Sequence, residues 1–311
     1  MKIEDLYFPR PNKDVKEDDF DLEAWRKENP MDYLKAAFLL NQAIAPAVQA
    51  EVFKTIFQVT RLYIPNILYK YFPLKDNEES NEKRFQALMN GKMYLSAVKD
   101  FNDPFDSKAF FYNPEVLKKY DRLKSCGGRL VDDFSSFQRV AALTANGVHS
   151  MPMWAHYANN HTGFCVSYDM TDVQNNILRS CTFPVQYTEQ RIDITCLMDS
   201  FVSNALKELE RQKNAGKHEI LIDDLSIVYL ACLLCNIKHS SWSYEQEFRC
   251  SAGTNAAGMP FVNAKAKEIF IGIHCSPEHA KRLRKTGNDL SIPVHQMVFD
   301  ETTETYQMKI E

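Results

Sequence analysis

Eight consecutive residues, from Trp242 to Arg249, bring two carboxylates and a guanidinium together and carry the strongest chemical signal in the sequence. If this octet is a β-strand, its side chains alternate between two faces, so Glu245, Glu247 and Arg249 lie on the same face. Two neighbouring carboxylates can divide the acid, base and electrostatic roles of a reaction between them. The alternative is a solvated strand face, on which a glutamate–arginine pair contributes only ~0–1 kcal/mol to stability. Glu245 and Glu247 are therefore our first catalytic candidates.

His156 is the third catalytic candidate. It lies between Trp154 and Tyr157 on a short predicted helix, and an imidazole can gain or lose a proton near neutral pH, which suits a general acid or base. The alternative is a buried histidine that is hydrogen-bonded to a backbone carbonyl. Four residues of this region could be imagined as a zinc set, namely His149, His156, His161 and Cys165. Their spacing matches no common zinc motif, so we expect no metal there.

A turn is predicted at Phe101–Asp106, because the Asn-Asp-Pro sequence disfavours helix. Asp103 and Asp106 could join the two glutamates in binding a divalent cation for phosphodiester cleavage. The alternative is that the asparagine and Asp103 only cap the backbone of the turn. In either case we expect the two phenylalanines of this segment to anchor the turn in the core.

Hydrophobic spacing predicts the elements that must position these residues. Apolar residues recur at three- and four-residue steps over 31–64, which indicates helix, and Pro46 is expected to break it. Further helices are expected at 78–90, 153–158, 193–214, 219–239 and 276–286. Strands are expected at 67–72, 92–96, 138–144, 163–169, 185–187, 242–249, 268–273, 293–299 and 304–310.

The irregular alternation of these strands and helices indicates the fold class. No glycine-rich nucleotide-binding fingerprint is present. We therefore expect an α+β fold, with a mixed or antiparallel sheet, helical insertions and an N-terminal helical extension. Residues 1–65 are expected to form an arm and this extension, and residues 66–311 a single α+β domain.

Composition limits the class of protein. The net charge of −4 does not indicate a nucleic-acid binder. The longest uncharged run near the N-terminus, residues 36–50, is too short to span a membrane. The eight cysteines are scattered along the chain, as expected for reduced thiols inside a cell. We therefore expect a soluble, cytoplasmic protein.

The order of five motifs resembles a widespread bacterial domain family of unknown function, numbered twenty-nine seventy-one. The motifs are Leu68–Tyr71, Phe101–Asp106, Met153–Ala158 running into Gly163–Phe164, Trp242–Arg249 and Glu268–Gly272. The resemblance covers roughly residues 66–311, and the first 65 residues lie outside it.

The layout of these motifs also looks like a diverged ADP-ribosyltransferase fold. Such enzymes carry a His or Arg on an early strand, a Ser or Tyr on a second strand and a Glu on a late strand, often within a Glu-x-Glu motif. The corresponding positions that this resemblance implies are Lys70 or Tyr71, Ser96 or Tyr94, and Glu245 with Glu247. The sequence departs from the pattern in having a lysine on the early strand and no Ser-Thr-Ser run on the second.

NAD is the substrate that this resemblance implies, and no other cofactor is expected. Cleavage of the nicotinamide–ribose bond passes through an oxocarbenium-like centre, which Glu247 would stabilise while Glu245 orients the acceptor. A cation would hold the pyrophosphate, and an aromatic ring would stack on nicotinamide or adenine. The candidates are Lys70 and Arg249 for the pyrophosphate, and Tyr71, Tyr94 and Trp154 for stacking. The alternatives are a solvated strand lysine and aromatic rings that only pack in the core.

Three functions remain open from the sequence. The first is an ADP-ribosyltransferase-like enzyme or toxin-like effector, acting in bacterial conflict or phage defence. The second is a metal-dependent nuclease or hydrolase that uses Asp103, Glu245, Glu247 and His156. The third is a non-enzymatic sensor or partner-binding module, whose partner would bind the helical segment 31–64.

Overall fold

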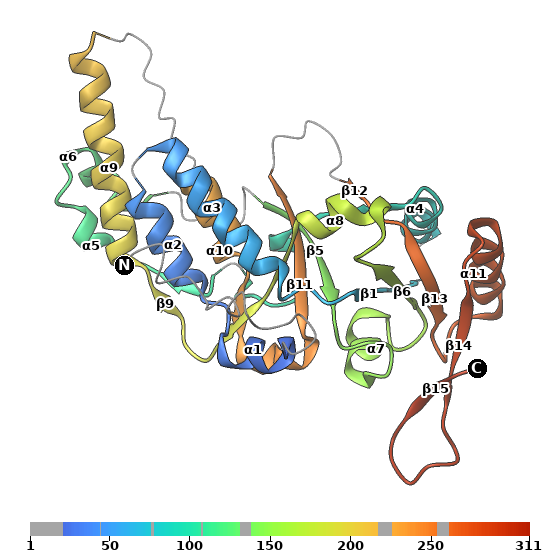
Figure 1. Ribbon diagram of the computed structural model, residues 1–311. Helices are drawn as coiled ribbons and strands as arrows, with labels where there is room; N and C mark the ends of the chain where they lie inside the picture. The colour runs from blue at the N-terminus through green and yellow to red at the C-terminus, as the bar shows by residue number, and fades with distance from the viewer. Residues whose placement is uncertain are drawn as a thin grey trace. The chain divides into compact units, whose positions relative to one another are not determined.

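The computed structural model describes residues 21–43, 45–75, 78–106, 108–130, 138–216, 226–253 and 261–311 (Figure 1). The first 20 residues of the predicted N-terminal arm lie outside the described part. The chain divides into two compact units. Unit 1 takes its described residues from 1–63, 97–139 and 184–241, and unit 2 from 64–96, 140–183 and 242–311.

A mixed sheet forms the centre of unit 2 and confirms the predicted α+β class. Its strands follow one another across the sheet in the order β15-β14-β13-β6-β1-β5-β11-β7. They are β1 (Ile67–Phe72), β5 (Gln138–Thr144), β6 (Phe164–Asp169), β7 (Thr182–Pro184), β11 (Glu247–Gly253), β13 (Ala266–Ile271), β14 (Val294–Phe299) and β15 (Met308–Ile310). β1 pairs antiparallel with β6 and β5, whereas β13 and β14 are parallel.

Side-chain alternation along β1 gives the sheet two apolar faces. Leu68 and Phe72 pack in one hydrophobic cluster, and Tyr71 packs in another with Trp154. Because side chains of a strand alternate, Lys70 projects from the same face as Leu68 and Phe72. A charged residue therefore lies in the middle of an otherwise apolar strand face.

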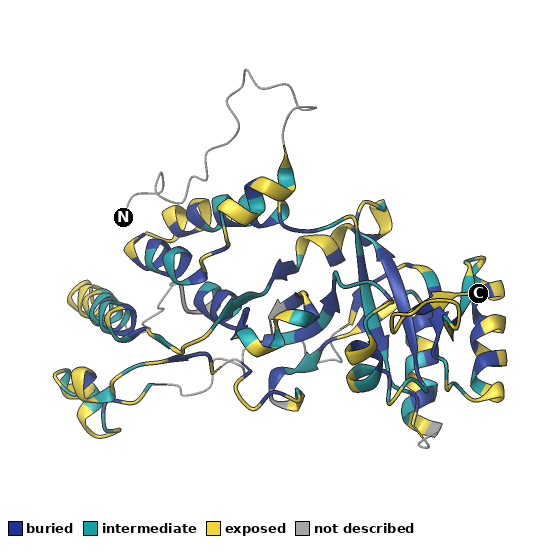
Figure 2. Ribbon diagram, turned by 90° about the horizontal axis from the view of Figure 1, so that it is seen from below, coloured by how far each residue is buried: buried dark blue, intermediate teal, exposed yellow. Residues whose placement is uncertain are grey.

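The helices of unit 2 are amphipathic and short. They are α4 (Glu78–Met89), α7 (Met151–Tyr157), α8 (Asn176–Ser180) and α11 (Pro277–Leu290), with a 3₁₀ turn η5 at Val173–Asn175. α11 begins where the Ser276 hydroxyl accepts a hydrogen bond from the His279 N–H at 3.2 Å, and it ends at Ser291, whose φ is 56°. Helices of the chain carry buried residues on one side and exposed residues on the other (Figure 2). A separate antiparallel pair joins β2 (Lys92–Tyr94) to β12 (Phe261–Asn263).

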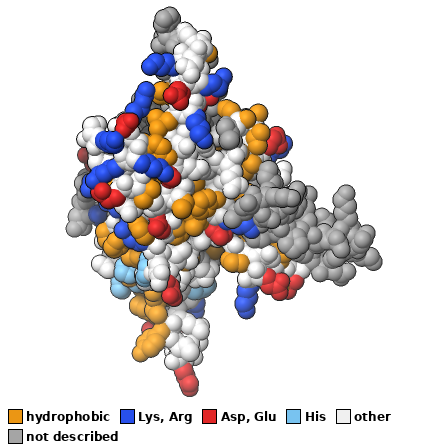
Figure 3. Space-filling view, turned by 90° about the vertical axis from the view of Figure 1, so that its left-hand side faces the viewer, with side chains coloured by type: hydrophobic (Ala, Val, Ile, Leu, Met, Phe, Trp, Pro, Cys, Tyr) orange, Lys and Arg blue, Asp and Glu red, His pale blue; other side chains and the backbone are white. Residues whose placement is uncertain are grey.

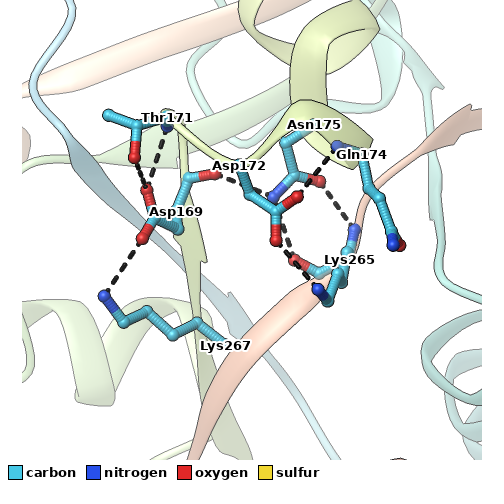
Figure 4. A network of polar contacts seen from close by, with 7 residues as sticks. All are labelled: Asp169, Thr171, Asp172, Gln174, Asn175, Lys265 and Lys267. Carbon is cyan, nitrogen blue, oxygen red and sulfur yellow. Dashed lines mark hydrogen bonds and ion pairs between the residues drawn. The ribbon is translucent and has the colours of Figure 1, made fainter.

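A polar network fixes η5 and the end of β6 to the start of β13 (Figure 4). The buried amide of Asn175 donates to the carbonyl oxygens of Asp169 and Lys265 at 2.9 and 3.1 Å, and its oxygen accepts from the Lys265 N–H at 2.7 Å. Two ion pairs surround it, Lys265–Asp172 at 2.9 Å and Lys267–Asp169 at 3.2 Å. The amide bonds both backbone groups of Lys265, directly before β13, and the carbonyl of Asp169, so this connection is held at several points.

Unit 1 is mostly helical. Its helices are α1 (Leu22–Glu28), α2 (Tyr33–Gln42), α3 (Pro46–Arg61), α5 (Pro114–Leu117), α6 (Asp121–Lys124), α9 (Thr195–Asn214) and α10 (Ser226–Leu234). Short strands accompany them: β4 (Phe110–Phe111) with β9 (Ile192–Asp193), and β8 (Gln186–Thr188) with β10 (Ile237–His239). α2 and α3 confirm the predicted helix of 31–64 and its break at Pro46, which is the first residue of α3. Tyr33, Ala36 and Leu40 of α2 are buried, and α2 packs on α9 and α10.

Two local predictions for unit 1 were wrong. The helix expected over 219–239 ends at Leu234, and β10 follows it. The Asn236 side chain donates to the Cys232 carbonyl at 2.7 Å, and the backbone carbonyl of Asn236 accepts from the Gln186 N–H at 2.8 Å, so β10 begins to pair with β8 there. Phe105 does not anchor its turn, because 57% of it is exposed. No helix of the described residues has the length and apolar character needed to cross a membrane.

Candidate functional site

The predicted strand 242–249 begins later than expected, which separates the two glutamates. Glu245 is the last residue of a 3₁₀ helix, η6 (Ser240–Glu245), and Glu247 is the first residue of β11. Gln246 between them has a φ of 44°, a conformation that is uncommon for residues other than glycine. Its N–H closes the helical turn on the Ser243 carbonyl at 3.1 Å, and its carbonyl accepts from the Ala145 N–H at 3.0 Å. Glu245 therefore does not share a strand face with Glu247, contrary to the simple alternation.

Glu247 and Arg249 form a buried ion pair on one face of β11. Arg249 donates through Nε to Oε1 at 2.7 Å and through Nη2 to Oε2 at 3.2 Å. Glu247 is 4% exposed and Arg249 is not exposed at all. Loss of one partner of such a pair leaves a buried charge and typically costs about 3–5 kcal/mol.

Lys70 lies near this pair, although it belongs to a different strand. Its Nζ donates to the Ala142 carbonyl of β5 at 3.0 Å, and the residue is half-buried. Burial lowers the pKa of Lys70 to about 8, while the charge of Glu247 opposes the decrease. In the sheet, β5 lies between β1 and β11, so one strand separates Lys70 from Glu247.

Glu245 is held by residues from two other elements. The Tyr157 hydroxyl of α7 donates to its carboxylate, and the Thr144 hydroxyl of β5 donates to its backbone carbonyl. The Asn146 side chain donates to the neighbouring Tyr244 carbonyl at 2.6 Å. Glu245 is 3% exposed, so its carboxylate is fixed and largely removed from water.

α7 carries His156 and Trp154 toward different surroundings. His156 is exposed, and its ring lies edge-on to Tyr157 with ring centres 6.3 Å apart. Trp154 is fully buried and donates from Nε1 to the Val148 carbonyl at 2.8 Å. His156 is therefore accessible beside the tyrosine that binds Glu245, whereas Trp154 lies in the core.

Tyr71 also lies in the core of unit 2. Its hydroxyl donates to the Gly147 carbonyl at 2.7 Å, and its ring makes an edge contact with Trp154 at a centroid distance of 5.1 Å. Burial raises the pKa of Tyr71 above its usual range. The structure thus brings Tyr71 and Trp154 together as hydrogen-bonded core residues.

Tyr94, Ser96 and Asp103 complete the predicted set. Tyr94 is 46% exposed on β2 and makes an edge contact with Phe261 at 5.6 Å, so its ring can be reached by a ligand. Ser96 is half-buried in β3 (Ser96–Ala97). Asp103 belongs to unit 1, where its carboxylate accepts from the Phe105 N–H at 2.9 Å and its carbonyl accepts from Asp106 at 3.1 Å. This is the backbone-capping turn that the sequence offered as the alternative.

The sequence did not predict that His161 lies in a left-handed turn beside Trp154 and His274. Asn159, Asn160 and His161 have φ values of 49°, 55° and 68°, so three successive non-glycine residues are left-handed. The His161 ring stacks on Trp154, and His274 lies 5.8 Å from it between ring centres. Burial and the charge of His274 lower the pKa of His161. The Asn-Asn-His-Thr-Gly sequence was the available signal, since asparagine tolerates this conformation and glycine follows.

Charges of both signs are interspersed over the face of the molecule drawn in Figure 3. Within the described ranges, no group of three or more His, Cys, Asp or Glu side chains is arranged to hold a metal ion.

Comparison with known proteins relates part of the chain to a protein family. No curated protein and no solved structure matches the chain significantly. Residues 153–250 match a family described as a protein of unknown function, DUF2971. The match contains the Met153–Phe164 and Trp242–Arg249 motifs, whereas the other three motifs lie outside it. This segment, which carries Trp154, His156, His161 and the Glu245–Arg249 group, is therefore similar to the DUF2971 family, and the match confirms the predicted resemblance for this part of the chain.

Proposed function

We propose that this protein is an ADP-ribosyltransferase-like enzyme that acts on NAD. The observation that carries the proposal is the electrostatic interaction of an early-strand cation, Lys70 on β1, with a late-strand carboxylate, Glu247 on β11, within one sheet. A cation suits a pyrophosphate and a carboxylate suits the developing charge of a ribose, so these two charges have the signs that binding of a dinucleotide uses.

The proposed reaction breaks the bond between nicotinamide and ribose and forms a bond between the same ribose carbon and an acceptor nucleophile. Nicotinamide leaves with the bonding electron pair, and the proton of the acceptor passes to a base. Glu247, fixed by Arg249, stabilises the positive charge that develops on the ribose. Lys70 binds the pyrophosphate, and access of NAD to the buried carboxylate requires local opening of this region.

Two further groups fit the acceptor side of this reaction. The Glu245 carboxylate is held by Tyr157, and His156 is exposed beside that tyrosine. His156 can take the proton of the acceptor, while Glu245 orients it. The exposed ring of Tyr94 offers a surface on which a base can stack.

We propose a cytoplasmic site of action, in a toxin-like effector or a phage-defence system. Transfer of the ADP-ribosyl group of NAD onto a cellular target, with release of nicotinamide, or depletion of NAD, would stop growth. This biological setting follows from the proposed chemistry and rests on it.

Calorimetric binding of NAD and release of nicotinamide test the proposal, with wild type compared to Glu247→Gln. Glutamine keeps the shape and a hydrogen-bond acceptor for Arg249 but removes the charge. We expect NAD to bind wild type saturably and nicotinamide release to fall at least about 100-fold in the variant, since a lost transition-state charge costs roughly 2.7–4 kcal/mol.

Glu301→Gln is the matched control, because Glu301 is an exposed glutamate on the loop between β14 and β15. It should behave as wild type. Folded wild type that neither binds NAD nor releases nicotinamide would rule the proposal out. Unchanged turnover in a folded Glu247→Gln variant would remove Glu247 from it.

A further inference from the structure

The turn between α7 and β6 is strained and yet held firmly. Its three left-handed residues, Asn159, Asn160 and His161, adopt a conformation that is uncommon outside glycine, although asparagine and histidine tolerate it better than most residues. Backbone bonds stabilise this conformation: the His161 N–H donates to the Trp154 carbonyl at 3.3 Å, and its carbonyl accepts from the His274 N–H at 3.0 Å. The Asn159 side chain adds a bond to the Leu74 carbonyl at 2.7 Å. Such strain persists only where the surroundings determine it, and it gathers at functional sites.

Two glycines allow the turn to reach the end of β13. A Cβ on Gly272 would lie 2.2 Å from the His161 carbonyl oxygen, and a Cβ on Gly163 would lie 2.1 Å from the Phe72 carbonyl oxygen. Only glycine fits at either position. The consequence is that His161, on the turn before β6, is brought to His274, on the turn after β13.

The separation of the two imidazoles falls within the range that two histidines on one metal ion have. Their ring centres are 5.8 Å apart and their planes make an angle of 61°. Two imidazoles on one Zn²⁺, with Zn–N distances of about 2.0–2.1 Å, have ring centres roughly 5–6 Å apart. The chemistry of the pair, two nitrogen donors, suits borderline divalent ions such as Zn²⁺, Ni²⁺ and Cu²⁺.

The hydrogen bonding of both rings leaves one nitrogen available on each. The Nδ1 of His161 is buried and has no hydrogen-bond partner among the described residues. The Nδ1 of His274 faces the Asn160 carbonyl at 3.4 Å, which leaves its Nε2 for a ligand. A backbone carbonyl on the second ring nitrogen is the usual way in which a metal-binding histidine is oriented.

We infer that His161 and His274 form a binding site for one borderline divalent transition-metal ion, which fastens the α7–β6 turn to the β13–α11 turn. The pair supplies two protein ligands, and water completes the coordination. The ion is therefore exchangeable, and the site is independent of NAD binding. Relief of the unpaired His161 nitrogen and closure of two loops are what metal binding contributes.

Thermal unfolding of the full chain with and without Zn²⁺ or Ni²⁺ tests this inference. We expect each ion to raise the Tm of wild type, and His161→Gln or His274→Gln to lose that increase. His239→Gln is the matched control, because His239 is exposed in unit 1, and it should keep the full increase.

A spectroscopic measurement on wild type avoids dependence on how His161→Gln folds. The chain has eight histidines, and ¹⁵N correlation spectra of their rings should show two that respond together at the lowest Zn²⁺ concentrations. The signals of His274 are those that disappear in the spectrum of His274→Gln, a substitution at an exposed residue. A Tm that no metal raises, a shift that survives in His274→Gln, or a response of other rings first would each overturn the inference.

Discussion

At the scale of single residues, burial changes what ordinary side chains can do. Lys70 lies on an apolar strand face, and its charge is costly because water is removed from it. Glu247 and Arg249 offset part of the same cost by pairing, since two hydrogen bonds of 2.7 and 3.2 Å join them. The sequence predicts all three residues in strands. Only the surroundings of each side chain in the fold make Glu247 and Arg249 an ion pair and bring Lys70 close to losing its proton.

The stability of the protein should therefore depend on pH through Lys70. Its folded pKa is about 8, below the ordinary value of 10.5, so between these pH values the unfolded chain binds a proton that the folded chain does not. The free energy of unfolding then rises with pH across that window, by about 3 kcal/mol at most from this group. Denaturant titrations of wild type and Lys70→Met at pH 8 to 10.5 measure it, and the variant should lack this increase.

Other groups titrate in the same window, so only the difference between the two proteins reports Lys70. Lys75→Met provides the comparison, because Lys75 is exposed, and its pH dependence should equal that of wild type. Equal slopes for wild type and Lys70→Met would show that the lysine is not desolvated in the folded protein.

At the scale of elements, helices were easier to predict than the start of β11. α3 and α11 carry their own start signals, Pro46 and the Ser276–Pro277 pair, and a clear amphipathic spacing. The start of β11 instead depends on Gln246, whose left-handed backbone is held by Ala145 from a distant part of the chain. The spacing of polar and apolar residues near β11 does not indicate that hydrogen bond.

The connection from β6 through η5 to β13 should depend strongly on one buried amide. Asn175→Ala removes three hydrogen bonds, two of them to the backbone carbonyl and N–H of Lys265, while the Asp169 carbonyl keeps its hydrogen bond from the Asp172 N–H. We expect a loss of roughly 1–3 kcal/mol in the free energy of unfolding, measured by urea titration. Gln174→Ala, at an exposed neighbour, should change it by less than about 0.5 kcal/mol. A loss that is equal in both variants would mean that the network in Figure 4 adds nothing specific.

At the scale of the whole molecule, the chain passes repeatedly between two compact units. The family match illustrates this, since residues 153–183 and 242–250 belong to unit 2 while 184–241 belong to unit 1. Each unit has its own hydrophobic core, built from segments that are far apart in the sequence. The division into units is therefore not one that a search for linkers along the chain can find.

The cysteines offer a test of packing across the molecule. The eight cysteines form no disulfide; Cys126 and Cys196 are exposed, whereas Cys165, Cys235 and Cys250 are buried. In the folded protein a thiol reagent should modify the two exposed residues first, identified by mass spectrometry of the peptides, and all eight after unfolding in denaturant. Early modification of Cys165 or Cys250 would contradict the packing of the central sheet.

The sequence alone determined the α+β class, most of the helices, most strands of the sheet and the resemblance of residues 153–250 to the matched family, but it did not indicate β7. It could do so because amphipathic period, proline and glycine act over a few residues. Only the tertiary structure decided that Lys70 lies near Glu247, that Glu245 is held by Tyr157, and that His161 lies beside His274. These pairs join residues separated by 88 positions or more, and their contacts arise from strand order and from glycines that permit close approach. No local pattern records which strand will be a neighbour, so the chemistry of the site is a property of the fold.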